Sequence, residues 1–337
     1  MFFKRLKLKF QCVFRQHDLN FSLKMSRIFN YNRLAGTIIN MKQTIFLEKP
    51  VNFNFKYTVF SHGWYSLPPF ELDTENWRLT YVFSDEKNNK RAATIFEIED
   101  KLKIEILGDQ IAEEFEQKIL CDTRHVLRLD ENLEAFYKLA ESNKEFRWIA
   151  ENNAGRLLRS PTVFEDLVKT VCTTNCSWAA TKKMCANLVE KLGDETAGGR
   201  RAFPTAEKMA SVPAEFYREE IRAGYRASYF AELAEKVAGG ETNPESWLDT
   251  NLSTAELKKE IKRLKGVGDY AAENLLKLVG RYDGLALDSW LRAQFYKKHR
   301  DGKVCADAEI KSFYERFGEW RGLAMWCDMT EKWFAEN

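Results

Sequence analysis

The sequence predicts an α+β fold in which a small antiparallel β domain precedes an all-helical domain. Three observations support this prediction. β-rich runs are confined to residues 43–130, helical spacing of apolar residues begins near 131, and 337 residues suffice for two domains. Hydrophobic residues make up 45% of the chain, so both domains can bury a core. We therefore expect a separate segment at 1–42, an α+β domain at 43–130 and a helical domain at 131–337.

The N-terminal segment, residues 1–42, is distinguished by its charge. Lysine and arginine are frequent there, and Asp18 is the single acid among the first forty residues. The segment contains no apolar core of signal-peptide length. Three interpretations stay open: a segment resembling an organelle transit peptide, a basic arm on DNA, or a translation start at Met41. We expect this segment to be disordered.

The α+β domain is predicted from short runs that alternate in polarity or are rich in β-formers. A polar turn at 85–90 separates two of these runs, and a short helix is expected at 111–120. The expected strands cover 45–47, 53–59, 77–83, 93–98, 102–106 and, last, 126–129.

The helical domain is predicted from apolar spacing and from residues that favour helix ends. Pro161 and Glu165 mark one helix start, and Ser253 with Glu256 resembles a capping box. The expected helices cover 133–149, 163–171, 179–192, 229–237, 257–264, 269–279, 289–298, 307–317 and 320–334.

A glycine turn followed by a lone acid is the most informative local pattern. Gly266-Val267-Gly268 joins two helical runs, and such a turn presents backbone N–H groups at a helix N-terminus, where an anion is favoured. A DNA phosphate is such an anion. Asp288 then follows an apolar stretch. Two simpler interpretations stay open: an ordinary glycine turn, and an Asp that only caps a helix.

Charge and cysteine content limit the possible classes of protein. The net charge of +2 is too small for general polyanion binding, so DNA contacts would need local patches. No run of about 18 apolar residues predicts a membrane span. The cysteines are odd in number, and no CxxC pair occurs, so we expect neither a disulfide framework nor a metal site. They are Cys12, Cys121, Cys172, Cys176, Cys185, Cys305 and Cys327.

Three further segments accompany the hairpin and Asp288: 164–175, 223–229 with its Gly-Tyr-Arg-Ala, and 317–324 with its Trp-Arg. In this order they resemble the helix-hairpin-helix (HhH-GPD) DNA glycosylase superfamily, specifically 3-methyladenine and 8-oxoguanine DNA glycosylases. The resemblance covers about 130 to 335, and more weakly 43–130. It implies a TBP-like β domain before an HhH-GPD domain, and an enzyme of base excision repair that flips a damaged base out of duplex DNA.

The resemblance also implies roles for individual residues. Asp288 would be the catalytic carboxylate that stabilises positive charge at C1′. Asn175 stands where the family fills the gap left by the flipped base, although a helix C-cap or turn role stays open. The remaining DNA contacts expected here are Gly266, Val267, Gly268, Lys265, Tyr270 and Arg292. For the base pocket we expect the aromatic residues Trp178, Tyr225 and Trp290, with Trp64 and Trp326 as further candidates.

One departure from the family bears on the reaction type. Relatives that also nick the strand carry a lysine two residues past the second hairpin glycine, where this chain has Tyr270. A phenol cannot form an imine, so we expect a monofunctional glycosylase without β-lyase activity. The expected substrate is an alkylated or oxidised purine. The alternative is a non-catalytic damage-binding protein on the same fold.

Expectations about cofactor, partner and location follow from the same resemblance. Only Cys305 and Cys327 lie beyond the hairpin, so no iron–sulfur cluster is expected. No cofactor is implied, although a monovalent cation at the hairpin is compatible with the pattern. The expected partner is duplex DNA with a damaged base, bound by a monomer without a membrane. The compartment would be cytoplasm or nucleoid in a bacterium, or nucleus or an organelle in a eukaryote.

Overall fold

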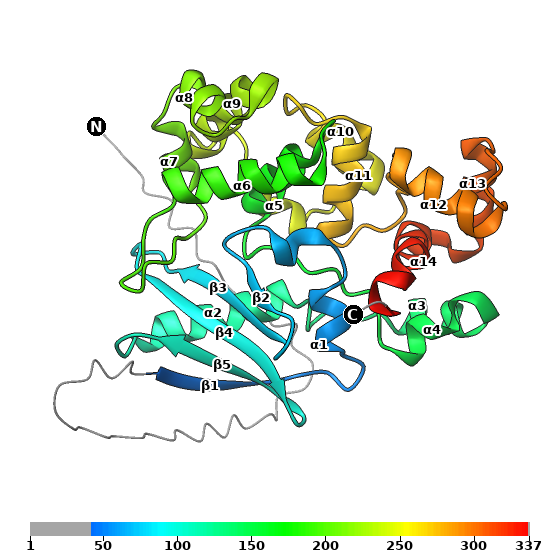
Figure 1. Cartoon of the computed structure of the whole chain (residues 1–337), viewed down its shortest axis with the longest axis horizontal. Coiled ribbons are helices and arrows are strands. Elements are labelled where there is room, and N and C mark those ends of the chain that lie inside the picture. The colour runs from blue at the N-terminus through cyan, green and yellow to red at the C-terminus, as the bar shows by residue number, and fades with distance from the viewer. Residues whose placement is uncertain (1–41, 336–337) are drawn as a thin grey trace. The chain divides into compact units, whose positions relative to one another are not determined.

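The computed structural model describes residues 42–335 and confirms an α+β fold, with a five-stranded sheet followed by helices (Figure 1). All neighbouring strands are antiparallel, in the order β1-β5-β4-β3-β2. The prediction for residues 1–42 lies outside the described residues except for Lys42, which begins β1. The strands are β1 Lys42–Glu48, β2 Glu71–Asp73, β3 Arg78–Ser84, β4 Lys90–Ile98 and β5 Lys101–Leu107.

One face of the sheet forms the core of the N-terminal part. In β5, Leu102, Ile104 and Ile106 alternate with polar residues and are fully buried. Ile104 pairs with Ile95 of β4, which extends the apolar face across the sheet. Helix α2, Glu113–Val126, buries Phe115, Ile119 and Val126 in the same core (Figure 1). The predicted helix at 111–120 is therefore present but longer.

Two predicted strands are wrong, and both segments belong to helices. Residues 53–59 alternate in polarity, yet Phe55–Val59 forms helix α1, whose N-cap Asn54 accepts a hydrogen bond from the Tyr57 amide. Phe55, Thr58 and Val59 are buried at helical spacing. Residues 126–129 are not a strand, because Val126 ends α2 and Arg128 turns the chain with a φ of 53°.

The helical part agrees with the predicted pattern in most places. Its exception is 133–149, which breaks near Ser142 into α3 Glu134–Glu141 and α4 Arg147–Glu151. No helix among residues 42–335 is long and apolar enough to cross a membrane. The remaining helices are α5 Val163–Thr173, α6 Trp178–Leu192, α7 Ala206–Ala210, α8 Ala214–Glu219, α9 Ala227–Ala238, α10 Thr254–Ile261, α11 Asp269–Leu278, α12 Ser289–His299, α13 Asp307–Tyr314 and α14 Arg321–Ala335.

Buried polar contacts join the sheet domain to α5. The Tyr81 hydroxyl donates to Glu165 at 2.5 Å, and the Trp64 indole N–H donates to Asp166 at 2.7 Å. Burial raises the pKa of Asp166 to about 6, even though hydrogen bonds from Ser160 and Trp64 favour the carboxylate. These contacts fix α5, whose far end leads into the candidate site.

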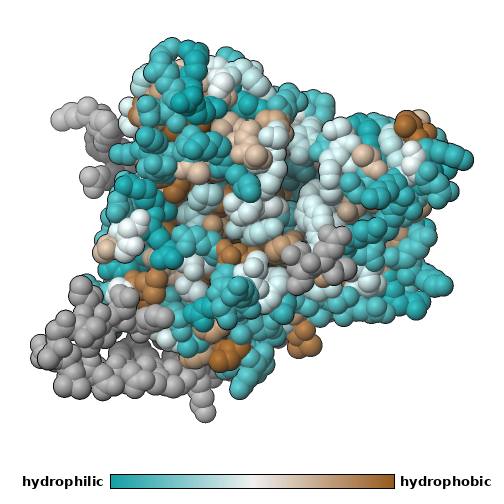
Figure 2. Space-filling model, in the orientation of Figure 1, coloured by the Kyte–Doolittle hydropathy of each residue, from teal (hydrophilic) through white to brown (hydrophobic). Residues whose placement is uncertain are grey.

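Arg128 fixes the C-terminal end of α11. Its buried guanidinium donates to the carbonyls of Lys277 and Leu278 at 2.7 and 2.5 Å. Both carbonyls belong to the last turn of α11, where carbonyls lack the full set of intrahelical partners, although that of Lys277 also accepts from the Gly280 amide at 3.2 Å. The surface over the helices is mainly hydrophilic, with less polar areas toward the centre of the face in Figure 2.

Candidate DNA-binding and catalytic site

The turn between α5 and α6 presents two of the predicted site residues to solvent. Asn175 lies in this turn with a φ of 44° and is exposed. It does not cap α5, because Thr174 is the C-cap residue, but its conformation fits a turn role. Ser177 caps α6 by accepting from the Ala180 amide, which places Trp178 at the first helical position with 40% exposure.

Trp178 also rests on the sheet domain. A Cβ atom added to Gly63 would overlap the Trp178 ring, so only glycine allows this close approach. The same loop is held by Ser61, whose carbonyl accepts the Trp326 indole N–H at 2.8 Å. The 61–64 loop, a part of the chain that precedes the helical domain, therefore contributes to the site.

The hairpin between α10 and α11 has the geometry of a backbone anchor. Gly266 adopts a φ of 87° and lies against Tyr229, so a side chain there would be strained and would overlap that ring. Val267 is buried and holds the turn. Gly268 is the N-cap of α11, offers no side-chain cap, and has open space where a Cβ would stand. The first N–H groups of α11 therefore face a gap that a phosphate oxygen can enter.

The charged residues near the hairpin are partly neutralised within the protein. Lys265 has a side chain that is 54% exposed, with its Nζ 3.6 Å from Glu232. Arg292 forms two hydrogen bonds of 2.8 Å to Asp307, so it would have to exchange this partner to reach a phosphate. Of these two predicted contacts, Lys265 is the better placed.

Asp288 lies where α5, α11 and α12 converge. It is the N-cap of α12, and its Oδ1 accepts the Leu291 amide at 2.7 Å. A carboxylate has a second oxygen, so capping does not exclude another role. Tyr270, in the first turn of α11, has its hydroxyl within hydrogen-bonding reach of Asp288 and of Thr173. Burial and, next, the charge of Asp288 raise the pKa of Tyr270 to about 12, so the phenol stays protonated.

Only some of the predicted aromatic residues come together. Trp290 is half-buried beside Asp288, and its ring centre lies 6.3 Å from that of Trp326. The ring centre of His62, in the 61–64 loop, lies 6.5 Å from that of Trp326. Tyr225, in contrast, is 52% exposed and packs on Tyr229 beside the hairpin. Trp290 and Trp326 therefore form an aromatic wall that begins two residues beyond Asp288 in the chain, whereas Tyr225 lies beside the hairpin.

Two charged residues of α11 were not predicted as site residues, although the position of Lys277 in the helix after the hairpin is evident from the sequence. Glu273 is half-buried and accepts from the Ala286 amide at 2.5 Å and from Lys258 at 2.6 Å. Lys277 is buried, and its Nζ has no hydrogen-bond partner among residues 42–335. Burial lowers the pKa of Lys277 to about 8, while Glu273 and Asp288 oppose the shift. Glu273 and Lys277 lie on the same helix as Tyr270, and this helical spacing is the sequence signal that could have indicated them.

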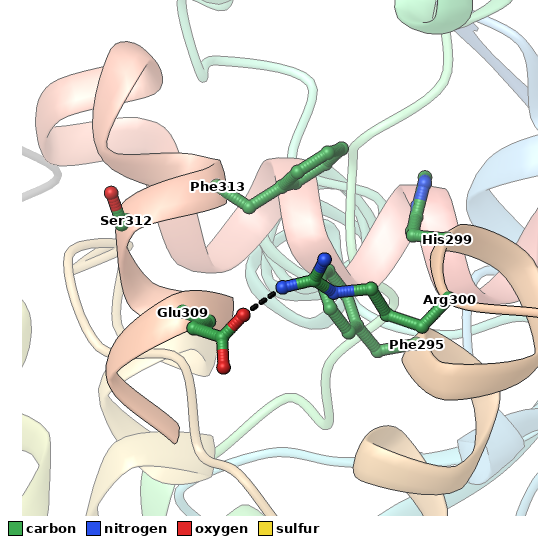
Figure 3. Close-up of a pocket in the computed structure, with 6 residues that line it drawn as sticks. All are labelled: Phe295, His299, Arg300, Glu309, Ser312 and Phe313. Carbon is green, nitrogen blue, oxygen red and sulfur yellow. Dashed lines mark hydrogen bonds and ion pairs between the residues drawn. The ribbon is translucent and has the colours of Figure 1, made fainter. Parts of the chain in front are cut away.

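An open pocket at the other end of α12 lies away from this constellation (Figure 3). It has a volume of about 400 Å³ and lies between the C-terminal end of α12 and α13, with an ion pair between Arg300 and Glu309 in its wall. Asp288 caps the opposite end of α12, roughly 15 Å away along an eleven-residue helix. This pocket therefore is not part of the candidate site.

Comparisons with known proteins show what this chain is similar to in sequence and fold. A family model described as HhH-GPD superfamily base excision DNA repair protein matches residues 168–324. The N-glycosylase/DNA lyase of Saccharomyces cerevisiae is 24% identical over 156 residues, which are 43% of this chain and 41% of the yeast protein. The chain thus matches less than half of the length of that relative.

Solved structures show the same fold over most of both chains. A 3-methyladenine DNA glycosylase from Archaeoglobus fulgidus is 19% identical with a TM-score of 0.69, covering 86% of this chain and 99% of that one. An 8-oxoguanine glycosylase/lyase from Clostridium acetobutylicum, in complex with double-stranded DNA, is 20% identical with a TM-score of 0.67, covering 89% and 99%. Residues 168–324 are therefore similar to the HhH-GPD superfamily of base excision DNA repair proteins, and the chain shares the fold of these solved structures.

Proposed function

We propose that this protein is a monofunctional DNA glycosylase that hydrolyses the N-glycosidic bond of a damaged purine in duplex DNA. The observation that carries the proposal is the convergence of the glycine hairpin, Tyr270 and Asp288 at one place. The hairpin supplies a sequence-independent phosphate anchor, and Asp288 supplies a charge beside it. The DNA-bound relative of the same fold supports duplex DNA as the partner.

Each group has a defined task in this proposal. The amides at Gly266–Gly268 bind the backbone, and Asn175 enters the gap left by the flipped nucleotide. As the bond from C1′ to the base breaks, the base takes the bonding electrons and positive charge develops on the sugar. The Asp288 carboxylate stabilises that charge and orients a water molecule. Water adds to C1′ and releases a proton, so the products are the free base and an abasic site.

The proposed reaction type rests on Tyr270. Its hydroxyl stays protonated at physiological pH and is positioned to hold the Asp288 carboxylate rather than to attack the sugar. A phenol offers no amine for imine formation. We therefore propose hydrolysis without strand cleavage, although the yeast relative is named a lyase.

The aromatic wall supports an alkylated purine as the substrate. The rings of Trp290 and Trp326 lie 6.3 Å apart, and Trp290 stands two residues beyond Asp288 in the chain. An alkylated purine that carries a positive charge stacks on the faces of such rings by cation–π attraction, worth about 0.5–2 kcal/mol. A neutral oxidised purine gains only the ordinary stacking energy, because it carries no positive charge. We therefore place alkylated purines ahead of 8-oxoguanine.

A panel of labelled duplexes tests this proposal. Each duplex carries one lesion, such as an N-alkylated purine or 8-oxoguanine, and an undamaged duplex serves as the control. We expect strand breaks only after alkali treatment, and fastest with the alkylated purine. Tight binding to damaged duplexes without any base release would instead identify a non-catalytic damage-binding protein.

A further inference from the structure

Glu273 connects the DNA-anchoring hairpin with the loop that carries Asp288. Its Oε1 accepts a hydrogen bond from Lys258 of α10 at 2.6 Å, and its Oε2 accepts one from the Ala286 amide at 2.5 Å. Lys258 lies in the helix before the hairpin, whereas Ala286 lies two residues before Asp288. One side chain thus touches both functional elements.

The bond to Ala286 holds a conformation that the backbone disfavours. Ala286 is 1% exposed and has a φ of 54°, in the left-handed region that residues with a Cβ rarely occupy. Gly284 of the same loop lies against Glu273, and a Cβ there would be 3.0 Å from its Cγ. Without the carboxylate, the Ala286 amide would be buried and unpaired in a strained turn.

The other side of the loop is fastened independently. The Gly322 amide donates to the Tyr282 carbonyl at 2.7 Å, and Arg321 donates to the Asp283 carbonyl at 2.5 Å. α14 therefore holds the start of the loop. Glu273 holds the part of it that leads directly into Asp288.

We propose that Glu273 is a positioning residue that fixes the Asp288 carboxylate relative to the DNA-bound hairpin. The inference rests on the proposed function of Asp288. The ion pair between Glu273 and Lys258 ties Glu273 to α10. The hairpin and the Asp288 carboxylate therefore keep a fixed position relative to each other. A displacement of about 1 Å in a catalytic group costs on the order of 100-fold in rate, so even a small relaxation of the loop is measurable.

Hydrogen–deuterium exchange tests the coupling without depending on activity. The full-length protein and its Glu273→Ala, Glu273→Gln and Asp269→Asn variants are compared, free and bound to a duplex containing a tetrahydrofuran abasic analogue. We expect faster exchange over 281–288 in Glu273→Ala, and rescue in Glu273→Gln, which keeps an acceptor for Ala286. Asp269→Asn is the matched control, because Asp269 also pairs with Lys258 at 3.0 Å but does not hold the loop. Unchanged exchange in Glu273→Ala would overturn the proposal.

Single-turnover base release tests the consequence for the reaction. We expect Glu273→Ala to slow release by about 10- to 100-fold while its affinity for the abasic-analogue duplex stays nearly unchanged. In an Asp288→Asn background, Glu273→Ala should add no further loss, because it acts through that carboxylate. A further loss there, or a full rate in Glu273→Ala despite loosened exchange, would contradict the positioning role. Full activity of Asp288→Asn alone would refute the proposed function instead.

Discussion

The hydroxyl of Tyr270 lies close enough to the carboxylate of Asp288 to feel its charge: burial and, next, the charge of Asp288 raise the pKa of Tyr270 to about 12. The first turn of one hairpin helix is thereby joined to the N-cap of the next helix. Tyr270 is therefore in contact with both proposed functional elements, the hairpin and Asp288.

Replacing Asp288 with Asn tests the carboxylate. The amide can still cap α12 by accepting from the Leu291 amide, so we expect the fold and DNA affinity to remain. Loss of the charge should slow base release by on the order of 100- to 1000-fold. Single-turnover kinetics at saturating enzyme measure this loss, and a near wild-type rate would reduce Asp288 to a cap.

The two hairpin glycines should respond differently to alanine. Gly268 has open space at its Cβ position and a φ of −87°, so Gly268→Ala should leave the melting temperature unchanged. Its methyl group would stand where a phosphate approaches, so affinity for damaged and undamaged duplexes should fall together. Gly266→Ala should instead destabilise the fold, because of the φ of 87° and the overlap with Tyr229. A Gly268→Ala variant with normal affinity would argue against the anchor.

Borohydride trapping tests the absence of lyase chemistry. Base release should produce an abasic site that breaks only with alkali, and no covalent protein–DNA adduct should form, because Tyr270 offers no amine. Lys265 and Lys277 are the amines to control. Lys265 is half-exposed at the hairpin, and the pKa of buried Lys277 is lowered by burial to about 8. An adduct that disappears in Lys265→Ala or Lys277→Met would refute the monofunctional assignment.

Lys277 should also make stability depend on pH. Its pKa of about 8 in the folded protein lies below the unfolded value of about 10.4. The lysine therefore costs stability at neutral pH, and this cost vanishes as the pH rises from 8 through 10.4. Lys277→Met should raise the free energy of unfolding by roughly 1–3 kcal/mol at pH 7 and by much less at pH 10. Urea unfolding of both proteins at the two pH values measures the difference, and an equal gain at both would show that packing is responsible.

The sequence allowed the helical domain to be predicted well, because its helices carry local signals at their ends. The box formed by Ser253 and Glu256 is present as expected, and the hairpin lies between the predicted helices. The strand predicted at 53–59 is wrong, because the spacing of the aromatic residues there is compatible both with the two-residue period of a strand and with a helix. The bond from the Tyr57 amide to Asn54 and burial of Phe55 against the core selected the helix.

Candidate site residues could be proposed from the sequence where the pattern is local, as for Asp288 and the hairpin glycines. Glu273 could not, because its proposed role depends on the unusual φ of Ala286, which brings the Ala286 amide to it. The contact between Trp326 and Ser61 could not be predicted either, because the two residues lie far apart in the sequence.

The hydrogen bonds from Tyr81 and Trp64 to α5 bear on where this chain could be cut to transfer its helical part to another protein. The family similarity begins at residue 168, inside α5 and after both of the acids that these bonds reach. A fragment cut at that border would also separate Lys169 from Glu165, its partner at 2.7 Å, and leave a buried charge alone. Recombination at the border of recognisable similarity is therefore expected to give a less stable fragment than recombination that keeps the sheet together with α5.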